Sequence, residues 1–215
     1  MGQVSGNFGL TGGVASGKTT AARMFEALGA RIIDADQIGH KLLRAPQKAY
    51  HEVIQRFGNE ILNPSGEIDR GRLAALAFHD LASLQELNNI LHPKILERTE
   101  ELATQYRAAD PGAVVLVEAA LIYEAGVADR FGKIIVTWCR PEQQRERLRA
   151  RPKVPPEQIE PRLAAQMPLE EKRRCADYVV DCSGSMESTQ AQVGTIYGEL
   201  RCLAAGRQAK IENRK

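Results

Sequence analysis

The segment GLTGGVASGKTT at residues 9–20 constrains the fold more than any other part of the chain. It follows a short apolar stretch and contains the pattern G-x-x-x-x-G-K-[ST], which requires a strand before it and a helix after it. Glycines let the backbone curl until successive N–H groups point inward, at the positive end of the following helix. The segment therefore predicts a loop that binds the phosphates of a nucleoside triphosphate.

Each residue type of this loop has an expected role. Lys18 is expected to bridge the β- and γ-phosphates, and the hydroxyl of Thr19 is expected to ligate Mg²⁺. The predicted nucleotide-binding residues are Gly12, Gly13, Val14, Ala15, Ser16, Gly17, Lys18, Thr19 and Thr20.

The remainder of the chain alternates short apolar runs with helical patterns. The runs are mostly β-branched and lie at residues 8–10, 32–33, 114–117, 134–138 and 178–180. This alternation predicts an α/β fold, a P-loop core with a buried parallel sheet flanked by helices.

Two segments depart from the alternation. Residues 36–110 are rich in helix formers and contain no convincing strand, and residues 149–175 mix charge with five prolines. We interpret the first as a helical insertion and the second as a mobile helical lid. The core is then formed by residues 1–35, 111–148 and 176–215.

Charge and hydropathy restrict the class of protein. The 215 residues are 43% hydrophobic, and 29 basic against 27 acidic residues give a net charge of +2, which argues against a nucleic-acid binder. No apolar run approaches the roughly 20 residues that cross a bilayer, so we expect no membrane partner and a cytoplasmic location. The cysteines, which form no Cys-x-x-Cys pair, are expected to be reduced thiols that fill space.

Carboxylates follow two of the predicted strands. Glu118 ends one strand, where it either supports a metal or caps the following segment. Asp34 and Asp36, in IIDAD, are expected to lie on the same side of an extended strand. One of them then accepts the proton of an attacking hydroxyl, or it merely caps a helix that begins near Gln37.

Arginines and one histidine complete the candidates. Five arginines lie between Arg140 and Arg151; of these, Arg145 and Arg149 are expected on a solvated helix face. Arg162, inside the predicted lid, is the better candidate for neutralising a transferring phosphoryl group. His92 precedes a proline that is expected to open a helix, and it is either a packed residue or a substrate contact.

A set of motifs in order resembles dephospho-coenzyme A kinases. The motifs are TGGVASGKTT, IIDAD, FGNEIL, GEIDRGRLAALAF, LHP, LIYE and RLAAQMPLEEKRRCADYVVDCSGS, between about residues 8 and 185. The resemblance implies transfer of a phosphoryl group from ATP to the 3′-hydroxyl of dephospho-coenzyme A, giving coenzyme A and ADP, with Mg²⁺ as cofactor. It also implies that the insertion binds the coenzyme A moiety.

The resemblance assigns roles to individual residues. Asp36 would be the base and Lys18 and Arg162 its catalytic partners, with Gln166 also delivered by the lid. Asp181 and Ser183 would lie beside the adenine. The substrate residues would be Asp34, Asp36, Arg70, His92, Glu118 and Glu124.

The chain departs from the family pattern in places. Residues 118–124 read E-A-A-L-I-Y-E where the family usually has D-I-P-L-L-F-E; Pro152 replaces an Asp and Cys182 a common Asn. A kinase for another small molecule or nucleotide stays an alternative. A nucleotide-gated binding module is a further alternative, although the guanine-reading motif N-K-x-D is absent from the sequence. A monomer or a small homo-oligomer is expected.

Overall fold

Residues 7–77, 79–152 and 154–212 are described in this computed structural model, in which the chain divides into two compact units. The first unit comprises Met1–Ile33 and Ala103–Lys215, and the second is Asp34–Leu102. The expected insertion at 36–110 overlaps most of the second unit, and the expected lid at 149–175 falls within the first. Residues 1–6 and 213–215 of the expected core, and residue 153 of the expected lid, lie outside the described residues.

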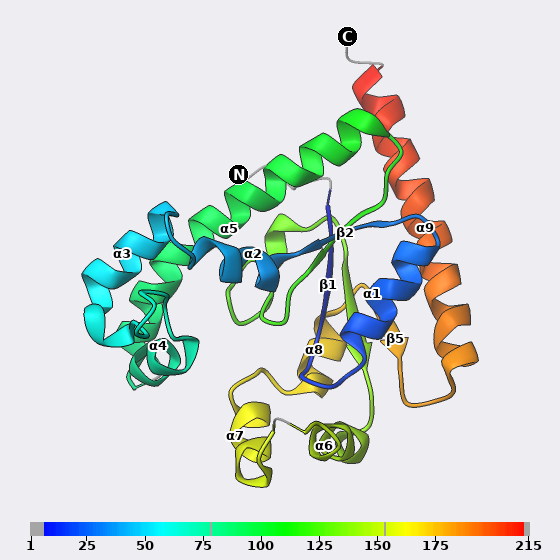
Figure 1. Cartoon of the computed structure of the whole chain (residues 1–215). Helices are drawn as coiled ribbons and strands as arrows, with labels where there is room; N and C mark the ends of the chain where they lie inside the picture. Colours follow the sequence, from blue (N-terminus) through cyan, green and yellow to red (C-terminus); the bar gives the residue numbers. More distant parts are fainter. Residues whose placement is uncertain (1–6, 78, 153, 213–215) are drawn as a thin grey trace. The chain divides into compact units, whose positions relative to one another are not determined.

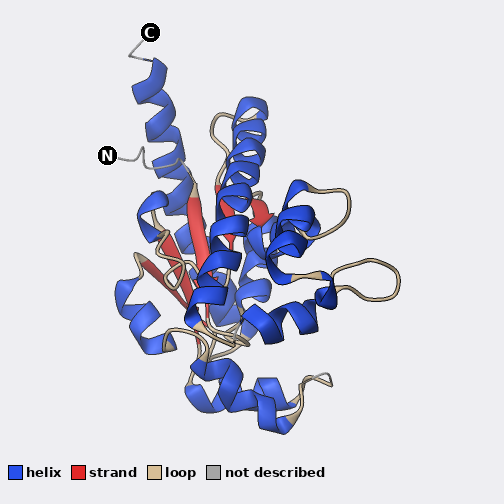
Figure 2. Ribbon diagram, turned by 90° about the vertical axis from the view of Figure 1, so that its left-hand side faces the viewer, coloured by secondary structure: helices blue, strands red, loops and turns tan. Residues whose placement is uncertain are grey.

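The strands form one five-stranded sheet in the order β2-β3-β1-β4-β5, drawn in red in Figure 2. They are β1 (Phe8–Gly12), β2 (Arg31–Asp34), β3 (Val115–Glu118), β4 (Ile134–Trp138) and β5 (Tyr178–Asp181). β1 pairs in parallel with β3 and β4, and β4 pairs in parallel with β5. Every expected apolar run contributes to a strand, so the predicted α/β fold with a parallel sheet is confirmed.

The strand order creates a crevice at one edge of the sheet. β3 and β4, which are consecutive strands, lie on opposite sides of β1. The connections that leave the carboxyl ends of such strands diverge, and ligands of open α/β sheets bind at that point. Gly12, Glu118 and Trp138 end the strands concerned.

The main core lies on the face of the sheet that α1 and α9 cover. α1 (Lys18–Ala27) and α9 (Met186–Glu212) run side by side (Figure 1) and contact each other. Their buried apolar side chains pack against Phe8, Leu10 and Ile135 of the strands. This face fixes the start of α1, and therefore the end of the loop that precedes it.

The opposite face of the sheet is covered mainly by the segment after β3 and by α8 (Leu169–Cys175). Ile134 and Val136 of β4 point to this face, whereas Ile135 between them points to the main core, as strand alternation requires. α8 has acidic residues in its first turn and basic residues in its last, which complements the helix dipole.

Two further helices precede α8 along the chain. They are α6 (Pro141–Arg149), whose first residue is a proline, and α7 (Ile159–Ala164). Arg145 of α6 and Glu160 of α7 form an ion pair of 2.7 Å. Arg145 is therefore engaged at the surface, as its expected place on a solvated face suggested.

The second unit is helical apart from an isolated bridge between Leu62 and Ile68. Its helices are α2 (Ala35–Leu42), α3 (Lys48–Phe57), α4 (Arg70–Ala77) and most of α5 (Leu81–Ala109). Val53, Phe57 and Ile61 are among the buried side chains of its own core.

Two expectations are corrected by the fold. Pro93 lies inside α5 and does not open a helix, because the long helix runs through it. Cys139 and Cys182 are buried as expected, but Cys175 and Cys202 are exposed and fill no interior space. Among the described residues, no helix is both long enough and apolar enough to cross a membrane.

Candidate nucleotide-binding site

The glycine-rich loop connects the end of β1 to the start of α1, as its pattern predicted. Gly17, directly before α1, has φ of 104°, and Ala15 also has a positive φ, of 60°. These left-handed residues curl the chain so that the backbone turns into the first turn of α1, where unpaired N–H groups favour an anion. The local conformation is that of a phosphate-binding loop.

Gly12 allows β4 to approach the loop closely. A Cβ on Gly12 would lie 2.2 Å from Thr137 Oγ1 and 2.5 Å from Ser16 Oγ. The hydroxyls of Ser16 and Thr137 share a buried hydrogen bond of 2.7 Å, and Thr137 also donates to Thr11 O. Glycine is needed here because these groups occupy the space that any side chain would take.

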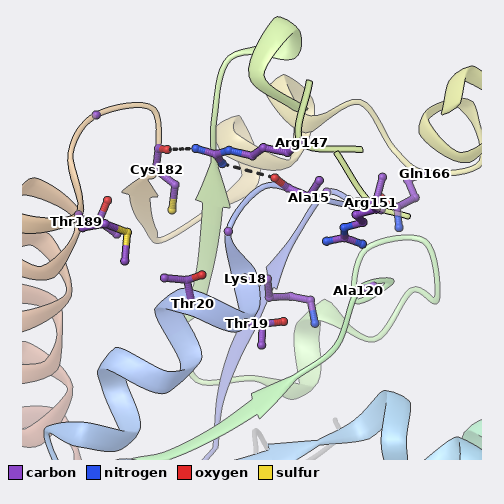
Figure 3. A pocket seen from close by; sticks show the side chains of 15 residues that line it. Ala15, Lys18, Thr19, Thr20, Ala120, Arg147, Arg151, Gln166, Cys182 and Thr189 are labelled. Carbon is purple, nitrogen blue, oxygen red and sulfur yellow. Dashed lines mark hydrogen bonds between the residues drawn. The ribbon is translucent and has the colours of Figure 1, made fainter. Parts of the chain in front are cut away.

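Side chains from other elements hold the loop backbone. Gln144 Nε2 donates to Val14 O at 2.7 Å, and Val14 N donates to Gln166 Oε1 at 2.8 Å. Arg147 donates to Cys182 O at 2.7 Å and more weakly to Ala15 O, bonds that Figure 3 shows as dashed lines. The loop is thus fixed by α6, by the expected lid and by the turn after β5.

Lys18 forms an ion pair with Glu118 at the carboxyl edge of the sheet. The distance from Lys18 Nζ to Glu118 Oε1 is 2.8 Å, and the two side chains are only 16% and 8% exposed. A partly buried charge pair is screened far less by salt than a surface pair. Glu118 therefore holds the Lys18 ammonium in place by direct contact.

A pocket with a volume of about 500 Å³ lies over this loop (Figure 3). Its loop lining is Gly13, Val14, Ala15, Gly17, Lys18, Thr19 and Thr20. Gly12 and Ser16, also predicted as nucleotide ligands, are buried and do not appear in the lining. Ser16 instead uses its hydroxyl to bind Thr137.

The other end of the pocket is formed by the turn after β5 and the start of α9. Cys182 and Thr189 lie at this end, away from Gln166 and Arg151 (Figure 3). Cys182 Sγ would be 2.8 Å from a Cβ on Gly17, so the turn packs directly on the loop. Burial raises the pKa of the Cys182 thiol to about 11.

Asp181 and Ser183 shape this turn, although the lining includes their neighbours and not these two residues. Asp181 Oδ1 accepts the N–H of Ser183 at 2.8 Å, and Ser183 O accepts Gln143 Nε2 at 2.9 Å. Their expected place beside the adenine stays a prediction.

Arg147 and Arg151, two of the five arginines noted in the sequence, line the pocket although neither was chosen as a site residue. Arg147 lies in α6 and Arg151 follows its end, and Arg145 and Arg149 have the same four-residue spacing, so the spacing alone did not favour either pair. Arg162, the arginine favoured in the sequence, donates to Gln158 Oε1 at 2.9 Å, and the pocket lining does not include it.

Four of the predicted substrate residues lie in the second unit. Asp34 ends β2 and caps α2, because its Oδ1 accepts the N–H of Gln37 at 2.8 Å. Asp36 lies in the first turn of α2, so strand alternation does not relate it to Asp34 as expected. Arg70 begins α4 and His92 lies in α5, where partial burial lowers the pKa of the imidazole.

Glu124, the remaining substrate candidate, belongs to the first unit. Its carboxylate pairs with Lys172 Nζ at 2.8 Å and accepts the N–H of Met167 at 2.8 Å. Both partners lie in the segment expected as a lid. The Glu124 carboxylate is therefore already bonded to two groups of the protein.

Comparison with known proteins identifies a family that covers most of the chain. A family model for dephospho-CoA kinase matches residues 7–188. A dephospho-CoA kinase of Thermobifida fusca is 38% identical over 193 residues, covering 90% of this chain and 95% of the relative. One from Aquifex aeolicus is 40% identical over 192 residues, covering 89% and 96%.

Solved structures agree with this match. The crystal structure of TT1252 from Thermus thermophilus has a TM-score of 0.75 and 28% identity, covering 90% of this chain and 96% of its own. The dephospho-CoA kinase from Campylobacter jejuni has a TM-score of 0.64 and 27% identity, covering 91% and 97%.

Substitution of Gly17 by Ala is expected to weaken ATP binding at least about tenfold. A left-handed residue with a Cβ costs roughly 1–2 kcal/mol, and this Cβ would also press on Cys182. Titration calorimetry with ATP measures the affinity. Gly194→Ala in α9, where nothing lies within 4 Å of the new Cβ, is the matched control and should bind ATP like the wild type. Equal affinities of the two variants would contradict the analysis.

Alkylation should distinguish the cysteines. At pH 8 about one Cys182 thiol in a thousand is ionised if its pKa is about 11, so iodoacetamide should modify exposed Cys175 and Cys202 first. The rate at Cys182 should still rise about tenfold per pH unit between pH 7 and 9, since this range lies below its pKa. Peptide mapping by mass spectrometry measures each rate. Modification of Cys182 as fast as Cys202 at pH 7.5 would contradict the raised pKa.

Proposed function

Because the chain belongs to the dephospho-CoA kinase family, which uses ATP to phosphorylate dephospho-CoA in the last step of CoA biosynthesis, we propose how its residues divide this work. The observation that carries the proposal is the pocket over the glycine-rich loop, with Lys18 in its wall and Glu118 bonded to that lysine. ATP is proposed to bind in this pocket with its phosphates on the loop.

The adenine is proposed to lie at the end of the pocket formed by Cys182, Gly184, Met186 and Thr189. This end is remote from Gln166 and Arg151 in Figure 3, and its lining includes a thiol, a methionine side chain, a glycine and the Thr189 hydroxyl. Such surfaces suit a flat aromatic base, whereas the loop and its lysine suit phosphate.

The residues present fit a magnesium ion beside the phosphates. Mg²⁺ prefers oxygen ligands and is commonly held by one or two protein groups together with substrate phosphates. The Thr19 hydroxyl in the pocket and the nearby strand-end carboxylate of Glu118 are such groups. No cluster of three or more His, Cys, Asp or Glu side chains that could hold a metal occurs within the described ranges, which agrees with this sparse donor set. When bound, Mg²⁺ neutralises charge on the β- and γ-phosphates.

Asp36 is proposed as the base. Its carboxylate would accept the proton of the 3′-hydroxyl while that oxygen attacks the γ-phosphorus, and ADP would leave with the electrons of the broken bond. Lys18 would stabilise the charge on the transferring group. The support for Asp36 is its place in the DAD sequence that resembles the family and its position in the first turn of α2.

Arginines are proposed to complete the charge stabilisation. Arg147 and Arg151 line the pocket, and Arg162 is proposed to reach the phosphates when the part of the expected lid that precedes Gln166 and α8 closes. Arg70, His92 and Asp34 remain proposed contacts of dephospho-CoA, on the resemblance alone. The resemblance implies the same contact for Glu124, but its bonds to Lys172 and Met167 favour a different role. A cytoplasmic location and a monomer or small homo-oligomer are proposed on the same basis.

The acceptor is tested by ADP release from the purified protein with Mg²⁺ and ATP. Dephospho-CoA should stimulate ADP release and yield CoA, whereas adenosine, AMP and pantothenate should not. Stimulation by another acceptor would make the chain a different small-molecule kinase. ADP release that no acceptor stimulates would contradict the proposed function and leave only the nucleotide pocket.

Asp36→Asn should lower kcat by about 10²–10⁴-fold, because an amide accepts no proton from the 3′-hydroxyl. Its affinity for ATP should stay near that of the wild type. Steady-state kinetics and calorimetry measure the two quantities.

Asp80→Asn is the matched control for this substitution, since Asp80 caps the start of α5 and asparagine caps helices equally well. Its kcat should remain within about twofold of the wild type. A kcat for Asp36→Asn as high as that of this control would remove Asp36 from the mechanism.

A further inference from the structure

Lys172 is a lysine with no exposure to solvent. It lies in α8, within the segment LEEKRRC, where the acidic and basic neighbours are exposed, yet its own residue is 0% exposed. Lysine is almost never fully buried unless its charge is paired, because removal from water disfavours the charged ammonium. The structure must therefore compensate this charge locally.

Two acceptors surround the Lys172 ammonium. Its Nζ lies 2.8 Å from Glu124 Oε1 and donates to Ala120 O at 2.8 Å. Ala120 O also accepts the hydroxyl of Thr11 in β1. Glu124 and Ala120 both belong to the segment that follows β3, so a single ammonium fixes this segment to α8 and, through Ala120, to the strand that leads into the loop.

The same ion pair connects to the nucleotide loop by a second route. Glu124 Oε1 accepts the N–H of Met167, and the preceding residue, Gln166, accepts the N–H of Val14 through its side-chain oxygen. The conformation of Gln166 is therefore fixed on one side by the loop and on the other by the Glu124 carboxylate. Ala120 and Gln166 both line the pocket.

Stability alone does not account for this arrangement. A buried ion pair pays for the desolvation of both charges, and apolar side chains of similar size often stabilise a protein equally well or better. What an apolar pair lacks is direction: the Met167 N–H needs an acceptor and the Ala120 carbonyl needs a donor, and the charge of each group holds the other in place.

We propose that Lys172 and Glu124 are positioning residues, a buried ion pair that holds Gln166 and Ala120 in the wall of the nucleotide pocket and thereby sets the affinity for ATP. Neither residue touches the nucleotide in this proposal. It rests on the proposed binding of ATP at the loop but not on the identity of the acceptor. It also gives Glu124 a role different from contact with dephospho-CoA.

Glu124→Gln tests the proposal directly. The neutral amide keeps the size of the side chain but leaves the buried ammonium without its countercharge. ATP affinity, measured by calorimetry, and the KM for ATP should both worsen about tenfold, because pocket groups acting in one network couple strongly. The KM for dephospho-CoA should change by less than about twofold, since the pair does not act on the acceptor.

A double-mutant cycle with Gln166→Ala shows whether the pair acts through Gln166. The double variant of Glu124→Gln and Gln166→Ala should bind ATP no more than about twofold worse than Gln166→Ala alone, because Glu124 then has no Gln166 side chain left to position, while Lys172 still holds Ala120 O. Losses that multiply would show that the two sites act independently and would overturn the proposal.

Two further variants separate an effect on ATP binding from an effect on folding. Lys172→Met combined with Glu124→Leu removes both charges together with the acceptor for the Met167 N–H, so it avoids an unpaired buried charge and should fold while still binding ATP about tenfold more weakly. Lys133→Met removes a lysine from an ion pair of 2.7 Å with Asp177 in the same unit, outside the pocket lining, and should leave ATP affinity unchanged.

Besides multiplying losses in the cycle, three outcomes would overturn the proposal: a lower melting temperature with unchanged ATP affinity in the paired variant, a selective rise in the KM for dephospho-CoA in Glu124→Gln, and an equal loss of affinity in Lys133→Met. Failure of the proposed function is distinct from each of them. It would appear in the wild type as ATP binding without turnover of dephospho-CoA. The ATP affinities of the wild type and of the Glu124 and Lys172 variants, measured by calorimetry, would still decide the role of the ion pair.

Discussion

The absence of a side chain at Gly12 is the constraint on which the nucleotide site depends. β1 and β4 are paired through Gly12 and Thr137, and the threonine hydroxyl lies where a Cβ on Gly12 would have to stand. The same hydroxyl binds Ser16, so the sheet itself holds the loop from behind. The loop does not rely on its own flexibility. Its glycines let a rigid sheet come close enough to fix it.

The sheet topology then gathers the remaining groups at the loop. Because β3 and β4 flank β1, their carboxyl ends bring Glu118 and the start of α6 to opposite sides of the same crevice. Gln144 and Arg147 of α6 bind loop carbonyls from one side, and Glu118 binds Lys18 from the other. Contacts of this kind restrict the loop, and a restricted loop lowers the entropic cost of binding.

The parts that the sequence predicted are those with a local signal. The strands are short β-branched runs, and the loop has a fixed glycine and lysine spacing, so both could be recognised without knowledge of distant contacts. The helix start predicted at Pro93 was wrong because tertiary packing can retain a proline within a long helix, here α5. Asp36 was placed on an extended strand, but the Asp34 cap ends that strand and starts α2 two residues earlier. The arginine spacing alone could not show that Arg147 and Arg151 line the pocket, because it carries no sign of which side of α6 and of the residues after it meets the loop.

The charged side chains around the nucleotide loop show what the overall composition does not. The net charge of +2 describes a nearly neutral molecule, yet Lys18, Glu118 and Lys172 are largely removed from water around one loop. Burial of ionic groups is a poor route to stability, since desolvation offsets most of the Coulomb attraction. Its advantage is geometry, because a charge in a poorly screened environment holds its partners in one arrangement. The first unit therefore uses buried charges where the position of a phosphate-binding backbone has to be fixed, and it uses apolar side chains between α1, α9 and the sheet, where close packing alone is sufficient.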